Sequence, residues 1–346
     1  TRLPMTPGPV AFLSQSGGHA QDLPLHAGPR GLTFSKVISY GNALDIDESE
    51  LLDYFAEDDE TEIIAAYIEG VRDGRRFRQA LERAARLKPV VVYKGGVSQA
   101  GRRATLSHTA SMTSSADIFA ALCRQANVLV VDDVQEMIDV LVALRCARPL
   151  PEGSRIAAVG QGGGPSVQAS DQMERAGLRF PALSPETRER LTAFLPAAGA
   201  IFSNPLDATN ILVPDVIQKT LRVLGEDREI DMMLYHMGFH PVTRWGEGLF
   251  ASEFFLKPAT EAFLNARAAT GKPVLLALGP AADLAGAKER LTVQEAFVRA
   301  GLPVFFNLEK AALALAPDIA LLAQQPQGIL AIDVAQLDLA RRSEDR

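Results

Sequence analysis

The chain has 346 residues, of which 47% are hydrophobic, so it is long enough to form two domains with well-filled cores. Its formal net charge of −7 gives no basic face, which argues against nucleic acid as a partner. Cys123 and Cys146 lack zinc-ligand spacing, and no apolar run approaches the roughly 18 residues of a membrane span. The first residues do not read as a signal peptide, so we expect a cytoplasmic protein without a metal site or a membrane partner.

Residues 1–9 read as a Pro/Gly-rich linker, after which short β-branched runs alternate with amphipathic stretches as far as about residue 147. The predicted strands are residues 10–13, 34–39, 63–68, 89–93 and 128–131, and the predicted helices are residues 48–56, 74–87, 115–125 and 134–146. This alternation predicts an α/β fold with a parallel sheet covered on both faces. Ligands of such sheets gather at the carboxyl ends of the strands.

The first strand runs into Ser14-Gln15-Ser16-Gly17-Gly18. A Ser/Gly turn that opens a helix presents backbone N–H groups and the positive end of the helix dipole, which suits a phosphate. Many α/β turns look alike, so this turn alone is a weak signal. Because proline lacks an N–H group, Pro24 predicts that the helix is short or kinked.

Four acidic residues follow the second predicted strand, between Asp45 and Glu50. They lack the spacing of a calcium-binding EF-hand loop, which needs Gly at its sixth position and Glu at its twelfth. We therefore interpret Asp47 as the N-cap of a helix whose first turn carries Glu48 and Glu50, where negative charge is favourable.

Glu69 stands at the carboxyl end of the third predicted strand. A carboxylate in this place could accept a hydrogen bond from an imidazole, which would fix the tautomer of the ring. It could equally form an ion pair with Arg72 or Arg75 and have no further role. The residues alone leave both readings open.

The fourth predicted strand ends in a Lys-Gly-Gly turn at residues 94–96, which leads into a polar loop of small residues. This loop carries Arg102, Arg103, Ser107 and His108, and we expect it to be mobile. An imidazole titrates near neutral pH and is a competent nucleophile toward phosphorus. Taken alone, His108 could also be an incidental surface histidine.

A linker at about residues 149–153 separates the first predicted domain from a second one. The second domain opens with a predicted strand, residues 155–159, which runs into a glycine turn that ends at Ser166. This turn resembles a dinucleotide-binding fingerprint, but Pro165 occupies the place of the third glycine and no acidic residue follows at a second strand end. We therefore exclude NAD. Gly163, Gly164 and Ser166 at a helix N-terminus still suit a single phosphate.

The rest of the second half contains a helix start at Ser184 and Pro185 and predicted strands at residues 232–235, 273–278 and 303–306. Asn204 and Asp207 are short polar residues that can hold a turn by bonding to the backbone. His236 lies four residues before another histidine, but the intervening glycine excludes the regular helix that paired zinc ligands would need.

Seven short motifs occur in order between residues 8 and 322: Ser-Gln-Ser-Gly, Gly-Asn-x-x-Asp-x-Asp, Glu-Gly-x-x-Asp-Gly-Arg-Arg-Phe, Lys-Gly-Gly, Ser-His-Thr, Gly-Gly-Pro and Asn-Pro-x-Asp. Each is weak, but the ordered set resembles the central part of the NDP-forming acyl-CoA synthetases, the superfamily that includes succinyl-CoA synthetase. The resemblance implies two flavodoxin-like doubly wound domains with mostly parallel sheets, at residues 10–149 and 150–325, followed by a tail at residues 326–346.

Members of that family convert acyl-CoA, ADP and phosphate into acid, ATP and CoA. The resemblance implies that His108 carries the phosphoryl group and that Glu69 orients it. It further implies that the phosphate is held by Ser16, Gly17, Gly18, Gly163, Gly164 and Ser166, with Arg102, Arg103, Ser107, Asn204 and Asp207 in support. The chain departs from the family at Ala110, where a glycine is usual, and at Pro24 and Ser166.

The resemblance also names ligands and partners. The ligands are CoA, phosphate and ADP or ATP with Mg²⁺, the nucleotide being bound by an ATP-grasp domain that is not recognisable in this sequence. A CoA-binding Rossmann domain is expected before residue 1, so the chain would be a fragment or a subunit of an oligomer. Two alternatives stay open: a degenerate CoA-binding, acyl-CoA-binding or regulatory module, and a transferase or lyase on the same scaffold.

Overall fold

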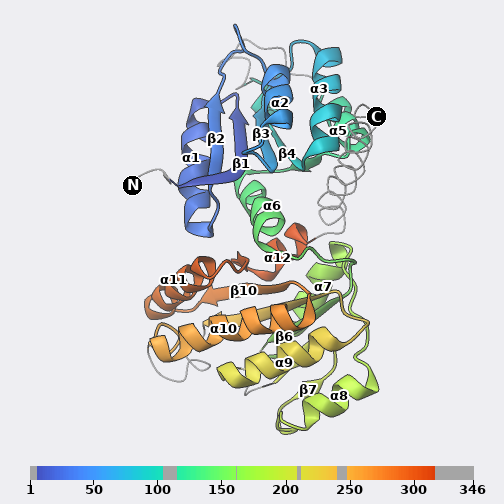
Figure 1. The fold of residues 1–346 in the computed structure, drawn as a ribbon, viewed down its shortest axis with the longest axis vertical. Helices are drawn as coiled ribbons and strands as arrows, with labels where there is room; N and C mark the ends of the chain where they lie inside the picture. Colours follow the sequence, from blue (N-terminus) through green and yellow to red (C-terminus); the bar gives the residue numbers. More distant parts are fainter. Residues whose placement is uncertain (1–5, 104–114, 161, 209–211, 240–247, 316–346) are drawn as a thin grey trace, which may run out of the picture. The chain divides into compact units, whose positions relative to one another are not determined.

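The computed structural model describes residues 6–103, 115–160, 162–208, 212–239 and 248–315. Two compact units make up the chain, and Figure 1 follows the path of each. The first contains the described residues up to Gly28 and Leu32–Leu141, and the second contains Pro29–Gly31 and the described residues from Val142 onward. The domain boundary predicted at residues 149–150 stays a prediction.

The first unit is built on a sheet of five parallel strands in the order β2-β1-β3-β4-β5. Its strands are β1 (Pro7–Ser14), β2 (Phe34–Ser39), β3 (Ile63–Ile68), β4 (Val90–Lys94) and β5 (Leu129–Val131). Its helices are α1 (Gly17–Ala27), α2 (Glu48–Glu57), α3 (Gly74–Leu87) and α5 (Ala116–Gln125), and α6 (Val134–Cys146) contains the division between the units. The predicted parallel α/β arrangement is confirmed, with element ends shifted by a few residues.

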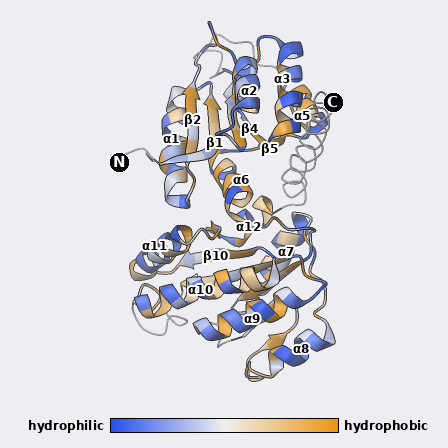
Figure 2. Cartoon of the chain, viewed as in Figure 1, coloured by the Kyte–Doolittle hydropathy of each residue, from blue (hydrophilic) through white to orange (hydrophobic). Residues whose placement is uncertain are grey.

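The core of this unit explains why β3 reads as an unbroken apolar run. All six of its side chains are buried, as expected for a central strand with both faces covered. Ile64 and Ile68 on one face belong to the same buried cluster as Phe55 of α2 and Phe77 of α3. Figure 2 shows the apolar strands of this sheet against helices that are polar on their outer sides.

Helix α2 begins as predicted. The Asp47 carboxylate accepts hydrogen bonds from the N–H groups of Ser49 (3.0 Å) and Glu50 (2.9 Å), and the Glu50 carboxylate accepts one from the Asp47 N–H group at 3.2 Å. This reciprocal capping satisfies donors that the first turn leaves without intrahelical partners. Asp47 is therefore the helix cap that its position in the sequence predicts.

The prediction that Pro24 shortens or kinks the first helix is wrong in its main part. Helix α1 continues through Pro24 to Ala27, and the Pro24 carbonyl accepts a hydrogen bond from the Gly28 N–H group. An interior proline removes one hydrogen bond and crowds the carbonyl four residues earlier, but it leaves its own carbonyl free to accept. Leu23, Pro24 and Ala27 are buried, and this packing holds the last turn in place.

The second unit contains six strands in the order β11-β10-β9-β6-β8-β7, parallel except for the β7–β8 pair. They are β6 (Ile156–Gly160), β7 (Ile201–Phe202), β8 (Leu206–Asp207), β9 (Met232–Phe239), β10 (Val274–Ala281) and β11 (Val304–Phe305). The helices are α7 (Gly163–Arg175), α8 (Pro185–Thr192), α9 (Pro214–Glu226), α10 (Glu253–Thr270), α11 (Leu284–Arg299) and α12 (Leu308–Ala314), and the short 3-10 helix η1 is Gly28–Arg30. Ser184 caps α8 as predicted, with its hydroxyl 3.1 Å from the Thr187 nitrogen.

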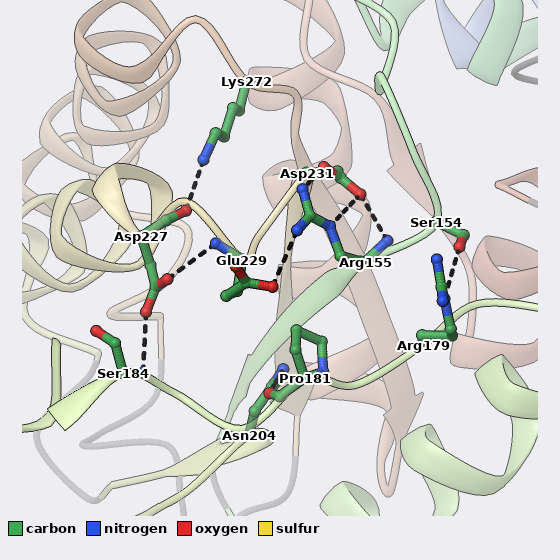
Figure 3. A network of polar contacts seen from close by, with 10 residues as sticks. All are labelled: Ser154, Arg155, Arg179, Pro181, Ser184, Asn204, Asp227, Glu229, Asp231 and Lys272. Atoms are coloured by element: carbon green, nitrogen blue, oxygen red, sulfur yellow. Dashed lines mark hydrogen bonds and ion pairs between the residues drawn. The ribbon is translucent and has the colours of Figure 1, made fainter.

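A polar network joins the amino ends of β6 and β9 (Figure 3). The Arg155 guanidinium donates to both carboxylate oxygens of Asp231, at 3.0 and 2.8 Å, and the Arg155 N–H group donates to the same carboxylate at 2.9 Å. A Cβ atom on Gly153 would lie too close to the Asp231 carboxylate, so a larger residue there would have to displace it. Lys272 donates to the Asp227 carbonyl at 2.8 Å. The network holds the amino-terminal ends of these strands, opposite to their carboxyl ends.

The two sheets repeat one topology. With β6, β8, β9, β10 and β11 in place of β1, β2, β3, β4 and β5, the strand orders are identical, and β7 is an addition at one edge. In this flavodoxin-like order the second strand lies on one side of the first strand and the third strand lies on the other. A crevice forms where the first and third strands end. The candidate sites are therefore the ends of β1 and β3 and the ends of β6 and β9.

None of the helices in the described ranges is long and apolar enough to cross a membrane. Within the same ranges, no three His, Cys, Asp or Glu side chains gather as a metal ion would require.

Candidate active site

Gln15 connects the carboxyl ends of β1 and β3. Its N–H group donates to the Tyr67 carbonyl at 3.0 Å, and its side-chain Oε1 accepts from the N–H groups of Glu69 (2.7 Å) and Gly70 (3.0 Å). The main chain around Glu69 is therefore held by bonds from a side chain on the neighbouring strand end. The Ser-Gln-Ser-Gly and Glu-Gly motifs meet at the crevice of the first sheet.

The Glu69 carboxylate has one oxygen engaged and one without a partner. Its Oε1 accepts a hydrogen bond from the Tyr67 hydroxyl at 3.0 Å. Its Oε2 is buried and has no hydrogen-bond partner within the described part of the chain. Arg72 instead donates to the Ala43 carbonyl, and Arg75 is exposed on α3. No ion pair with either arginine is found among the described residues, so the simple ion-pair reading of Glu69 is wrong.

Two further polar atoms near this crevice are buried without a partner among the described residues: the Tyr40 hydroxyl and Glu48 Oε1. Burial, reinforced by the carboxylates of Glu48 and Glu69, raises the pKa of Tyr40 well above its usual value. Burial likewise raises the pKa of Tyr67, with Glu69 adding to the effect. Both tyrosines therefore remain protonated hydroxyl donors at neutral pH.

Lys94, the last residue of β4, is 4% exposed. Its ammonium group donates to the Glu69 carbonyl at 2.7 Å and to the Gly95 carbonyl at 2.5 Å, and it lies 5.6 Å from the centre of the Phe119 ring. Burial lowers the pKa of Lys94 to about 8, although the nearby Glu69 carboxylate opposes this shift.

The first predicted phosphate turn opens α1. Ser16 caps the helix by accepting from the His19 N–H group at 3.3 Å, and the Ser14 hydroxyl donates to the Ser16 carbonyl at 2.7 Å. Gly17 and Gly18 are exposed, and the first N–H groups of a helix have no intrahelical acceptor. This geometry suits an anion. The role of the three residues in binding phosphate stays a prediction.

The second predicted phosphate turn opens α7 in the other unit. Gly162 has a φ of 99°, which favours glycine, and its N–H group donates to the Asp207 carboxylate at 2.8 Å. Gly163 and Gly164 are exposed in the first turn of α7. The Ser166 hydroxyl donates to the Gly162 carbonyl at 3.0 Å. In this structure that hydroxyl bonds to the turn, and the role of Ser166 in binding phosphate stays a prediction.

Asn204 completes the hydrogen bonding of β6. Its amide donates to the carbonyls of Ile156 (2.7 Å) and Pro181 (3.1 Å), and its oxygen accepts from the Ala158 N–H group at 3.1 Å. Because β8 has only two residues, a side chain provides the bonds that a longer strand would give. Asn204 and Asp207 therefore hold backbone, as their residue types suggested, while their part in a phosphate site stays a prediction.

Sequence reasoning did not place His236 in a site. It lies on β9 directly opposite Gly160 of β6, at the crevice of the second sheet. Cβ atoms built on Gly160 and Gly279 would lie 3.5 Å from Nδ1 and 3.1 Å from Nε2 of its ring, so the two glycines leave the space that the imidazole fills. Burial lowers the pKa of His236 to about 4, so the ring is neutral at pH 7. The sequence signal that could have identified His236 is the pair of glycines, Gly160 and Gly279, near the ends of the two strands that flank β9.

An apolar pocket of about 140 Å³ lies between the segments that lead into α9 and α10. It is lined by Leu212, Val213, Pro214, Leu249, Phe250, Phe254 and Phe255. Its lining, among the residues that the structure describes, offers hydrocarbon contacts and no titratable side chain.

His108 and Ser107 lie outside the described residues, as does Ala110. Arg102 and Arg103 are described: residues 99–103 form a helical turn, in which the Ser98 hydroxyl accepts from the Gly101 N–H group at 3.0 Å. The polar loop predicted after the Lys-Gly-Gly turn thus begins as helix. Both arginines are exposed at this turn, and their supporting role stays a prediction.

Comparisons with known proteins agree with this fold. Residues 7–144 match the succinyl-CoA ligase like flavodoxin domain. The alpha subunit of acetate–CoA ligase [ADP-forming] II from Pyrococcus furiosus is 37% identical over 227 residues, which cover 66% of this chain and 49% of that protein. Acetate–CoA ligase [ADP-forming] II from Archaeoglobus fulgidus is 29% identical over 308 residues, covering 87% of this chain and 42% of that protein.

A solved structure extends the similarity over both units. The dinucleotide-forming acetyl-coenzyme A synthetase 1 of Ca. Korarchaeum cryptofilum, determined in complex with phosphate and ADP, has a TM-score of 0.75 and 26% identity, covering 94% of this chain and 68% of that chain. The fold and the strand-end residues thus define an α/β protein of the flavodoxin-like type. The chain belongs to the ADP-forming acyl-CoA synthetase family and is related to its acid–CoA ligases. It spans about half the length, or less, of these curated relatives.

Proposed function

We propose that this chain is the phosphoryl-carrying part of an ADP-forming acyl-CoA synthetase, which converts acyl-CoA, ADP and phosphate into acid, ATP and CoA. His108 would carry the phosphoryl group, and Glu69 would orient its ring. The two glycine turns, at Gly17 and Gly163, would bind phosphate oxygens.

The observation that best supports this proposal is the state of the Glu69 carboxylate. It stands at the topological switch point of the first sheet, with one oxygen held by Tyr67 and the other buried without a partner among the described residues. A buried carboxylate oxygen without a donor costs about 1–3 kcal/mol or more, so such a group is normally satisfied in the working protein. An imidazole N–H group is a donor of suitable chemistry.

The chain's own groups would then act in sequence. Glu69 accepts one ring N–H group of His108, so the lone pair of the other ring nitrogen is free to attack phosphorus. Attack on an acyl phosphate, formed when phosphate displaces CoA from the acyl group, releases the acid and leaves the phosphoryl group on His108. Attack on that phosphorus by ADP then forms ATP and restores the imidazole. Helix N-termini and arginines stabilise the charge of the transferring group.

The partners of the chain belong to the same proposal. Two relatives are named as alpha subunits, which supports assembly with a second, nucleotide-binding subunit or domain of the ATP-grasp type. A CoA-binding domain is the other expected partner. The solved relative was determined with phosphate and ADP, ligands that the proposed reaction also requires.

The test is phosphoryl uptake from labelled ATP and Mg²⁺ by the full chain, supplemented with an ATP-grasp subunit. We expect acid-labile, base-stable label in the wild type and in His26→Asn, a control at an exposed histidine of α1, and none in His108→Asn. Label of equal amount in His108→Asn would refute the proposed carrier. A wild-type chain that takes up no label would favour the alternative of a binding module that has lost catalysis.

A further inference from the structure

The Lys-Gly-Gly turn has no assigned role beyond ending β4, yet it lies against Glu69. Three neighbours hold this glutamate in place: Gln15 accepts from its N–H group at 2.7 Å, Lys94 donates to its carbonyl at 2.7 Å, and Tyr67 donates to its Oε1 at 3.0 Å. The main-chain donor, the main-chain acceptor and one side-chain oxygen are thus all engaged. Only Oε2 remains without a partner among the described residues.

Tyr67 is placed to hold the carboxylate because residues two apart on a strand point to the same side. Its ring is itself packed between two others: the His19 ring lies 4.3 Å away in an edge-on arrangement, and the Tyr93 ring lies 5.1 Å away. Such contacts restrict the ring, so the hydroxyl donates from a fixed point. The bond therefore selects which way the carboxylate of Glu69 turns.

Lys94 acts on the main chain of the same residue. A buried ammonium group is unfavourable unless acceptors surround it, and here it bonds the carbonyls of Glu69 and Gly95, which follow β3 and β4. These two carbonyls belong to the residues that directly follow the last pair of the parallel ladder, Ile68 and Lys94. The lysine thus joins the two strand ends at the position of Glu69.

Gly95 leaves room for this arrangement. A Cβ atom at position 95 would lie 2.5 Å from the Tyr67 hydroxyl oxygen and 3.2 Å from Glu69 Cγ. Any other residue would displace the Tyr67 hydroxyl or the carboxylate. Lys94 and Gly95 together account for the first two residues of the Lys-Gly-Gly motif in physical terms.

We propose that Tyr67 and Lys94 are positioning residues for Glu69, which they hold so that its Oε2 is presented to a hydrogen-bond donor. The inference rests on the proposed function in one respect, since that donor is taken to be the ring of His108. Tyr67 fixes the rotation of the carboxylate, and Lys94 fixes the backbone that carries it.

The experiment compares the rate of His108 labelling in Tyr67→Phe and Lys94→Met, each made in the wild type and in Glu69→Ala. Loss of a hydrogen bond to a charged group corresponds to roughly a tenfold change, so we expect each variant to slow labelling by about tenfold in the wild type. In the Glu69→Ala background neither change should alter the remaining rate by more than about twofold. The reason is that residues acting only through Glu69 lose their effect once its carboxylate is gone, whereas the effects of independent residues would add. Tyr54→Phe, at a half-exposed tyrosine of α2, is the matched control and should label at the wild-type rate.

A merely structural role would slow labelling equally in both backgrounds, and that result would overturn the proposal. A second readout is independent of the reaction: the urea midpoints of Tyr67→Phe, Glu69→Ala and the double variant. We expect the double variant to shift by less than the sum of the single shifts, whereas additive shifts would overturn the Tyr67–Glu69 pairing. If neither the wild type nor any variant takes up label, the proposed function fails. The urea midpoints still decide whether Tyr67 holds the Glu69 carboxylate in place.

Discussion

Lys94 makes the stability of the first unit depend on pH in a direction that can be worked out. Burial lowers its pKa from the usual 10.5 to about 8 in the folded chain. Between these two values the unfolded chain binds the lysine proton and the folded chain does not, so the free energy of unfolding rises with pH. Each unit of pKa difference corresponds to about 1.36 kcal/mol. The free energy of unfolding therefore rises by at most about 3 kcal/mol between pH 8 and pH 10.5. Below pH 8 the full cost of the buried charge is present.

The assay is urea unfolding of the wild type and Lys94→Met, followed by pulsed thiol labelling of Cys123 in a Cys146→Ser background. Cys123 is buried in the core of the first unit, so its labelling reports the unfolding of that unit. We expect the wild type to gain stability relative to Lys94→Met as the pH rises from 8 to 10. The exposed-lysine control, Lys288→Gln, should show no such trend. A constant or falling difference would refute the argument that Lys94 is a buried ammonium group.

Two further predictions concern the second unit. Asn204→Ala removes three hydrogen bonds and leaves the backbone groups of Ile156 and Ala158 without their partner. We therefore expect the free energy of unfolding of this unit, measured in urea, to fall by about 3 kcal/mol. A fall below about 1 kcal/mol would show that water replaces the side chain. For His236 the folded pKa of about 4 lies below the ordinary 6.5, so protons bind the unfolded chain first as the pH falls. Thermal unfolding should therefore show the wild type losing up to about 3 kcal/mol relative to His236→Gln between pH 6.5 and pH 4, and a gain over this range would contradict the neutral ring.

Much of the fold follows from local patterns. The β-branched runs of the first sheet and the capping residues Asp47 and Ser184 predict their elements because each signal acts within a few residues. Strands β7 and β8 were not predicted, since two-residue strands have no periodicity and depend on the Asn204 side chain. The effect of Pro24 was overestimated because burial of the surrounding residues outweighs one lost bond.

The candidate site was predictable in part. Glu69 follows from its position after a buried strand, but the residues alone could not separate an ion pair from a site role. Tyr67 could have been found from its spacing of two residues, which places it on the same side of the strand as Glu69. Lys94 could not, because a buried lysine with two carbonyl partners from neighbouring strand ends has no local sequence signature.

The measurement that tests the central claim most directly is the single-turnover rate of phosphoryl transfer to His108, with the modified residue located by mass spectrometry. The account predicts that the label lies on His108 and that Glu69→Gln slows its formation by about tenfold or more, in line with loss of a hydrogen bond to a charged group. Glu62→Gln, which changes an exposed carboxylate just before the same strand, should label at the wild-type rate. Label on another residue, or a Glu69→Gln rate equal to that of the wild type, would contradict the account.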